Sequence, residues 1–195
     1  MDEPSWDAQG CVERVRQGDE AAARDLVRHL YPVILRIVRS HLPRRTAEED
    51  LVQNVFMKVF AKLHQFSSAV PLEHWVSRIA VNTCINELQR ERVRPELRWA
   101  DLSEEQEEVV RSLAANEADL TAAQSLASRE LVEKLLDRLG PQDRLVVTWL
   151  HLEGRTLEEI RGLTGWSTTR VRVRAFRARQ KLRKHLRALM ETKLK

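Results

Sequence analysis

Apolar residues recur every three or four positions through most of the chain, which is the spacing of amphipathic helices. In the N-terminal half, the first such stretch carries Val12, Val15, Ala22, Leu26, Leu30, Val33, Ile34, Ile37 and Val38. A second helix is predicted from about Thr46, where Glu49 three residues later completes a capping box. A third is predicted from Pro71 to about Arg92, after a short loop without helical periodicity. These elements predict one compact helical domain.

The C-terminal part shows a second group of helices. Periodicity resumes at Leu126 and is interrupted by Gly140 and Pro141. A capping box formed by Thr156 and Glu159 predicts a short helix. That helix is expected to end near Gly165, and Ser167 is a suitable N-cap for a long basic helix that follows. Two consecutive helices joined by such a tight turn are typical of a helix-turn-helix.

Between these two groups the pattern weakens, and acidic residues crowd a short stretch that contains Glu104, Glu105, Glu107 and Glu108. Only six Gly and six Pro occur in 195 residues, and aromatic residues make up 5%, so helix formers dominate. We therefore predict an all-α protein of two small helical domains, residues 1–94 and 126–195. A flexible acidic linker at 95–125, with one loose helical segment at most, joins them.

Charge divides the chain into three electrostatic segments. Residues 1–95 carry 14 basic and 13 acidic residues (net +1), residues 96–139 carry 5 and 11 (net −6), and residues 140–195 carry 14 and 5 (net +9). From Arg170 to Arg187 nine basic residues occur with no acid among them. A charge run of this kind is either a solvated helix face or a surface for a polyanion. The helix-turn-helix pattern directly upstream favours DNA as the polyanion.

The long basic helix has two distinct faces. Its apolar stripe is predicted to consist of Val171, Ala175, Ala178, Leu182, Leu186 and Leu189. The opposite arc carries Arg170, Arg172, Val173, Phe176 and Arg177. Arginine donates two parallel hydrogen bonds to guanine edges or phosphates, and the two apolar side chains suit thymine methyl groups or sugars.

Two faces in the first domain are candidates for binding. Trp75, Ile79, Asn82 and Asn86 share one helical stripe, in which asparagine can bind base edges and tryptophan can stack on an unstacked base. Two asparagines beside a tryptophan also occur on ordinary half-buried helix faces, and the residues alone favour that interpretation. On the preceding helix, Asp50, Gln53, Asn54 and Met57 form an arc opposite the apolar residues, which suits a protein partner.

Four segments occur in a specific order along the chain: Val12–Asp19, Glu49–Phe56, Phe66–Asn82, and Leu139–Ile160 followed by Val171–Arg179. In this order, with a linker between the two domains, they resemble a bacterial extracytoplasmic-function (ECF) sigma factor of the sigma-70 family. The resemblance extends over nearly the whole chain. It implies a promoter-specificity subunit of RNA polymerase, without a cofactor, a bound metal or catalysis of its own, controlled by an anti-sigma factor.

The resemblance also implies a role for each segment. Binding of the clamp helices in the largest subunit of core RNA polymerase is expected from Asp50, Gln53, Asn54, Phe56 and Met57. Binding and melting of the minus-ten element is expected from Trp75, Arg78, Ile79, Asn82 and Asn86. Binding of the minus-thirty-five element is expected from Arg170, Arg172, Val173, Arg174, Phe176 and Arg177, in a domain that also meets the flap of the second-largest subunit. In such factors the acidic linker approaches polymerase surfaces that hold nucleic acid, so its glutamates are either phosphate mimics or part of a simple tether.

Other classes of protein fit the sequence less well. A stand-alone helix-turn-helix repressor would share residues 140–195 but would not need the Trp75 and Asp50 faces, and co-elution with core polymerase separates the two. The six histidines form no HExxH motif, no glycine-rich phosphate loop occurs, and the two cysteines have no metal-binding spacing. No run of about 18 apolar residues and no basic, apolar leader is present, so a cytoplasmic protein is expected.

Overall fold

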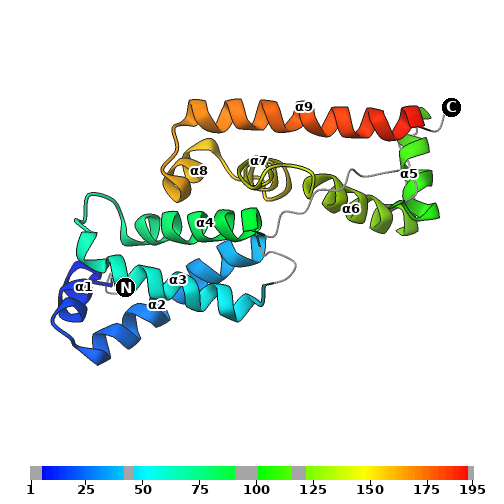
Figure 1. Ribbon diagram of the computed structural model, residues 1–195. Helices are drawn as coiled ribbons and strands as arrows, with labels where there is room; N and C mark the ends of the chain where they lie inside the picture. Colours follow the sequence, from blue (N-terminus) through cyan, green and yellow to red (C-terminus); the bar gives the residue numbers. More distant parts are fainter. Residues whose placement is uncertain (1–5, 42–45, 91–100, 116–121, 193–195) are drawn as a thin grey trace, which may run out of the picture. The chain divides into compact units, whose positions relative to one another are not determined.

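The structure, a computed structural model, describes residues 6–41, 46–90, 101–115 and 122–192. All regular elements within these residues are helical (Figure 1): α1 (Ala8–Arg16), α2 (Glu20–Ser40), α3 (Glu48–Lys62), the 3-10 turn η1 (Leu63–Gln65), α4 (Leu72–Arg90), α5 (Glu104–Ala115), α6 (Ala122–Leu136), α7 (Pro141–Val147), the π-helical turn η3 (Thr148–Leu152), α8 (Leu157–Thr164) and α9 (Thr168–Thr192). They form two compact units, one containing α1 to α4 and α8 and the other containing α5 to α7, η3 and α9.

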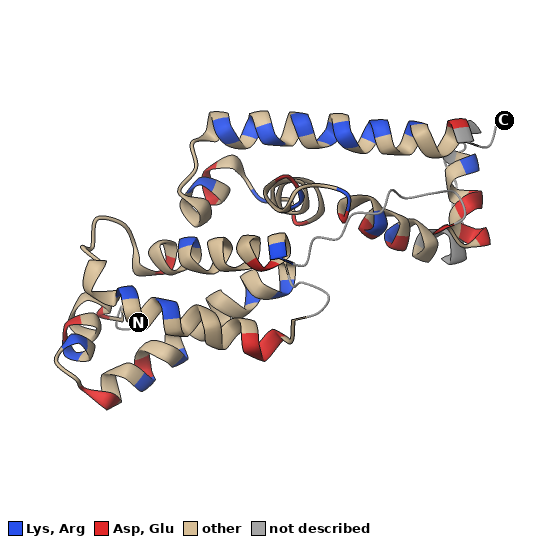
Figure 2. Ribbon diagram, in the orientation of Figure 1, with Lys and Arg blue, Asp and Glu red and all other residues tan. Residues whose placement is uncertain are grey.

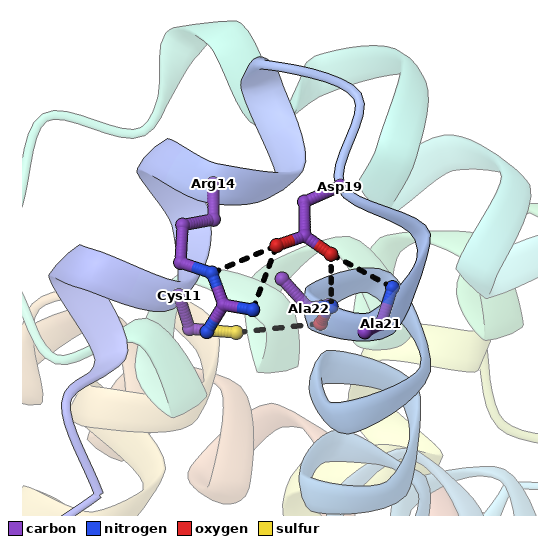
Figure 3. Close-up of polar contacts among 5 residues, drawn as sticks. All are labelled: Cys11, Arg14, Asp19, Ala21 and Ala22. Atoms are coloured by element: carbon purple, nitrogen blue, oxygen red, sulfur yellow. Dashed lines mark hydrogen bonds and ion pairs between the residues drawn. The ribbon is translucent and has the colours of Figure 1, made fainter.

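The first predicted helical stretch is two helices, because the chain turns between α1 and α2. Gly18 adopts a φ of 87°, a left-handed conformation that glycine accepts without strain. Asp19 then caps α2, where its Oδ1 accepts hydrogen bonds from the backbone nitrogens of Ala21 (2.8 Å) and Ala22 (3.0 Å). The guanidinium of Arg14 pairs with the same carboxylate at 2.7 Å, as Figure 3 shows. The apolar period continues through the turn, so periodicity alone does not reveal it.

The core of the first unit lies where α2 packs against α1, α3 and α4. Each helix contributes its apolar stripe, and the most deeply buried members include Leu26, Leu30, Ile34, Val55, Val59, Val76 and Ala80. The predicted capping box at Thr46 and Glu49 is wrong, because α3 begins at Glu48 with Ala47 as its N-cap. Three acidic residues in the first turn interact favourably with the positive helix N-terminus instead. The sequence predicted Pro71 as the first residue of the next helix, whereas α4 begins one residue later, at Leu72.

The predicted linker is folded from residue 101 to residue 115. Helix α5 packs against α6, and Val109 and Val110 are almost completely buried there. Their core also includes Leu102, Ala127, Leu131 and Leu189, with Leu135, Leu186 and Met190 packed against it. The expectation of a loose segment is therefore wrong for α5, because burial supplies the stability that a short polar helix lacks by itself. The expected domain boundary at 94/95 and residues 116–121 of the linker lie outside the described residues.

The acidic residues that suggested a linker have a structural role at the start of α5. The first turn contains Glu104, Glu105 and Glu107, which favourably oppose the positive end of the helix. Arg111 pairs with both Glu107 and Glu108 at 2.9 Å. These contacts place the acidic cluster on a folded helix.

The predicted turns of the C-terminal part are confirmed. Helix α7 begins at Pro141, directly after Gly140. At the start of α8, Thr156 Oγ1 accepts from the backbone nitrogen of Glu159 (3.2 Å), while the Glu159 carboxylate accepts from the backbone nitrogen of Thr156 (2.7 Å). Gly165 ends α8 with a φ of 73°. None of the helices in the described part of the chain combines the length and hydropathy that a membrane span requires.

Candidate nucleic-acid interface

Helix α9 presents a basic face to solvent along its whole length. Its apolar stripe is confirmed: Val171, Ala175, Ala178 and Leu189 are buried, and Leu182 and Leu186 are half-buried. Lys and Arg recur along most of the helix, as the blue segments of α9 in Figure 2 show. Arg170, Arg172 and Arg177 are exposed, and Val173 and Phe176 retain 42% and 56% of their surface. Exposed aromatic and aliphatic side chains among arginines suit the mixed polar and apolar surface of a DNA groove.

Arg174 is set apart from these residues, because it takes part in an internal ion pair. Asp143, the third residue of α7, is 5% exposed. Its carboxylate accepts from Arg174 Nη1 at 2.9 Å and from Lys181 Nζ at 2.6 Å. We call these three residues the α7–α9 clasp. A buried carboxylate requires such partners, so the structure gives Arg174 a role in holding α9 against α7, where the sequence predicted a DNA contact.

Helix α4 carries the residues predicted for the minus-ten element. Asn82 and Asn86 are exposed, while Arg78 and Ile79 are half-buried. Trp75 is also half-buried, and its ring packs against Phe66 with centroids 5.6 Å apart and planes tilted by 57°. The helix therefore presents two exposed amides, with an aromatic side chain near its start that is held by a neighbouring ring.

The start of α4 is fixed to the rest of its unit by a carboxylate and an imidazole. Nε2 of His29 lies 2.8 Å from Glu73 Oε1, and the ring of Trp6 stacks on His29 with centroids 3.8 Å apart. Burial would raise the pKa of Glu73, but hydrogen bonds from His29 and from its own backbone nitrogen outweigh burial and hold that pKa below its usual value. Glu73 therefore favours its ionised form next to His29.

Helix α3 carries the face predicted for core polymerase. Asp50 and Gln53 are exposed, Asn54 is half-buried, and Met57 retains 60% of its surface. Phe56 differs, because it is buried in the core of the unit. Its side chain packs inside the fold, so only the other four residues of the predicted set offer side-chain surface to a partner.

Sequence reasoning missed two residues that matter for these surfaces. Asp143 gave no signal beyond a carboxylate in the first turn of a helix, and its partners lie 31 and 38 positions away. Arg16 was not singled out either, although it reaches the backbone of the loop before α4. Among the described residues, no group of three or more His, Cys, Asp or Glu side chains is placed to hold a metal ion.

Comparison with known proteins identifies the family. Residues 26–94 match the family Sigma-70 region 2, and residues 129–182 match Sigma-70, region 4. The ECF RNA polymerase sigma-E factor of Escherichia coli (strain K12) is 30% identical over 176 residues, which cover 88% of this chain and 90% of that protein. This chain belongs to the ECF RNA polymerase sigma factors. The sigma-E factor of Haemophilus influenzae (strain ATCC 51907 / DSM 11121 / KW20 / Rd) is also 30% identical to this sigma factor, over 93% of the chain and 96% of that protein.

The fold of this ECF sigma factor is also similar to a solved structure. CnrH, in its complex with the cytosolic domain of CnrY, matches with a TM-score of 0.53 and 24% identity over 91% of this chain and 96% of that one. The predicted fold class of two helical domains and the predicted sigma function are confirmed. As a sigma factor, the protein acts in transcription initiation with core RNA polymerase and promoter DNA. A stand-alone repressor is excluded by the match to region 2.

Proposed function

We propose that three surfaces divide the work of this sigma factor. The exposed face of α9 binds the minus-thirty-five duplex, the exposed stripe of α4 holds melted minus-ten DNA, and the outer face of α3 binds the clamp helices of core polymerase. The α3 and α4 surfaces lie in residues 1–94 and the α9 surface lies in residues 126–195, which we propose as the two domains, with residues 95–125 as the segment between them. The observation that supports the proposal most strongly is the separation on α9 between arginines that face solvent and Arg174, which pairs with buried Asp143.

The minus-thirty-five role is tested by removing two solvent-facing arginines. Arg172→Ala and Arg177→Ala should each weaken duplex binding by about 1–3 kcal/mol if the arginine contacts a base edge. Arg24→Ala is the matched control, because it removes an exposed arginine from α2, outside the proposed interface. Fluorescence anisotropy with a minus-thirty-five duplex at low salt measures the affinities. Parental affinity in the Arg172/Arg177 double variant would contradict the assignment of α9.

The minus-ten role is tested with single-stranded DNA. A base that leaves the stack costs a few kcal/mol, which contacts in the protein must offset. Holoenzyme with Asn82→Ala should still form closed complexes but bind a single-stranded minus-ten oligonucleotide more weakly. Gln17→Ala, which removes an exposed amide outside α4, is the control. Equal single-strand affinity for parent and Asn82→Ala would refute the role of this residue.

The α3 face is tested by co-elution with core polymerase. Met57→Lys places a charge on an exposed apolar side chain and should weaken co-elution, whereas Phe56→Leu should act through stability because that residue is buried. Undiminished co-elution of folded Met57→Lys protein would remove this face from the proposal. The resemblance of the sequence further implies control by an anti-sigma factor, a contact of region 4 with the flap of the second-largest subunit, action in the cytoplasm, and no covalent chemistry. These points belong to the same proposal.

A further inference from the structure

Arg16 extends from α1 to the backbone that precedes α4. Its Nη2 donates hydrogen bonds to the carbonyl oxygens of Leu63 (2.8 Å) and Phe66 (2.6 Å). These carbonyls belong to the first residue of η1 and to the residue that ends it. A carbonyl oxygen can accept two hydrogen bonds, and that of Leu63 also accepts one from the backbone nitrogen of Phe66 at 3.1 Å, so Arg16 adds a cationic donor to this turn. One guanidinium nitrogen thus links α1 to η1 by binding two carbonyl oxygens that lie 47 and 50 positions after Arg16 in the sequence.

The backbone that Arg16 holds leads directly into the loop of residues 66–71, which we call the recognition loop. Phe66 is buried, and its ring packs against Trp75 on α4. The next residues, Ser67 to Ala69, are exposed, and Ser68 adopts a φ of 59°. A left-handed conformation is costly for a residue other than glycine and persists only where neighbouring structure enforces it. Arg16 holds the backbone carbonyl of Phe66 and Trp75 packs against its ring, so the residue two positions before Ser68 is held through both its backbone and its side chain.

The same loop and α1 together line a hollow in the surface. A cavity of about 400 Å³ is lined by Ala8 and Gln9 of α1 and by residues 66 and 68–72 of the loop and the start of α4. A second hollow of about 370 Å³ is lined by residues of α1, including Arg16 itself, and by Phe66, Ser67 and Ser68. The shape of both hollows therefore depends on the distance between α1 and the recognition loop. Arg16 is a side chain whose hydrogen bonds span that distance.

We propose that Arg16 is a positioning residue for minus-ten recognition: it fixes the recognition loop against α1, so that the loop and Trp75 are pre-ordered for an unstacked base. The inference rests on the minus-ten role proposed for α4. Arg16 acts through the backbone of Phe66 and need not touch DNA itself. Pre-ordering of a loop raises affinity because the entropy of ordering is no longer lost on binding.

The chemistry of arginine explains why this side chain suits the position. Its planar guanidinium holds several donors in fixed directions, so two carbonyls can be bound without further loss of side-chain freedom. The second terminal nitrogen, Nη1, lies 3.4 Å from Glu13 on the same helix, which keeps the group oriented. Lysine can follow the same path but offers a flexible point charge. Arg16→Lys should therefore retain part of the effect, and Arg16→Ala none.

The experiment compares Arg16→Ala and Arg16→Lys with Arg14→Ala in holoenzyme. Arg14 is the matched control because it lies on the same helix, carries the same charge and pairs with Asp19, the N-cap of α2 (Figure 3). Arg16→Ala should bind a single-stranded minus-ten oligonucleotide at least about tenfold more weakly, the lower end of the roughly 10- to 150-fold range expected for loss of a charge-assisted hydrogen bond. Its affinity for a minus-thirty-five duplex should match that of the parent. Arg16→Lys should fall between Arg16→Ala and the parent.

A second readout separates positioning from simple stabilisation. Amide hydrogen exchange in the full chain should become faster in the segment 63–72 of Arg16→Ala, while α3 exchanges as in the parent. If Arg16→Ala does not fold, Arg16→Lys carries the test, and parental single-strand affinity and exchange in it would overturn the inference. Equal single-strand affinity for folded Arg16→Ala and parent, or an equal loss in Arg14→Ala, would also overturn it. If the parent itself fails to bind the minus-ten oligonucleotide, the proposed minus-ten role fails first.

Discussion

Replacing Asp143 with asparagine should destabilise the second unit without weakening its attraction to DNA. The Asp143→Asn side chain would keep its shape but lose the negative charge that Arg174 and Lys181 share at 2.9 and 2.6 Å. A hydrogen bond to a charged group contributes about 1.5–3 kcal/mol. The Lys181 side chain is 52% exposed and regains water readily, so its share is small, whereas Arg174 is 28% exposed. We expect a net loss of about 2 kcal/mol in the free energy of unfolding.

The same change should act in the opposite direction on non-specific DNA binding. Two cations lose the carboxylate that opposes them in the parent and can turn to phosphates, and each added phosphate contact steepens the dependence of log K on log salt by about 0.9. Below the unfolding transition, the variant should therefore bind a random duplex at low salt at least as tightly as the parent. A structural clasp predicts this opposite change in stability and affinity. A direct DNA contact by Arg174 would predict no loss of stability on changing Asp143.

Urea unfolding followed by circular dichroism measures the stability, and amide exchange of α7 and α9 localises the effect. Glu108→Gln is the control, since it removes the same charge from a surface pair of the same unit, with Arg111, in which the side chains are 50% and 44% exposed, and it should cost less than about 1 kcal/mol. Arg174→Met, combined with Asp143→Asn, completes a double-mutant cycle whose coupling energy reports the Asp143–Arg174 pair. An unchanged urea midpoint with an unchanged slope for Asp143→Asn would refute the reasoning.

Three further predictions concern stability and chemistry. Val110→Ala should lower the free energy of unfolding of the second unit by about 1–3 kcal/mol in urea, because it removes two methyl groups from the core around α5; no loss would mean that α5 is not packed in solution. Burial raises the pKa of the Cys84 thiol to about 12 and also raises the pKa of Cys11. Neither thiol should therefore react with a thiol reagent at pH 7 until urea unfolds the chain. Fast labelling of the native protein would contradict this burial. The pKa of Glu73 is lowered in the folded state, so the stability that its ionised carboxylate contributes is present above its unfolded pKa near 4.5 and is lost as pH falls through the folded pKa. Glu73→Gln should therefore make the free energy of unfolding less dependent on pH in that window. An identical acid-unfolding profile for parent and variant would argue against the His29 contact.

The sequence alone determined the features that depend on near neighbours. The capping box of Thr156 and Glu159, the glycine stop at Gly165 and the apolar stripe of α9 are all set by groups three or four positions apart. Such groups meet in any helix, so their spacing is visible before folding. The family could also be inferred from the sequence, because four segments occur in a specific order.

The tertiary structure decided which members of each pattern face solvent. Arg172 and Arg174 are two positions apart on one basic helix, yet Arg174 meets a buried carboxylate from α7 while Arg172 is exposed. Phe56 and Met57 are adjacent, and one is buried while the other is exposed. Spacing cannot separate these pairs, since each depends on what packs against the flank of its helix.

Helix α5 shows the physical reason most clearly. It is acidic and only 12 residues long, and an isolated helix of that length is marginal in water. Burial of Val109 and Val110 against residues of α6 and α9 makes it a folded element. Arg16 depends in the same way on carbonyls 47 and 50 positions away. Local spacing determined where helices form, whereas these contacts exist only after distant parts of the chain have folded together, because their free energy comes from partners that no local pattern contains.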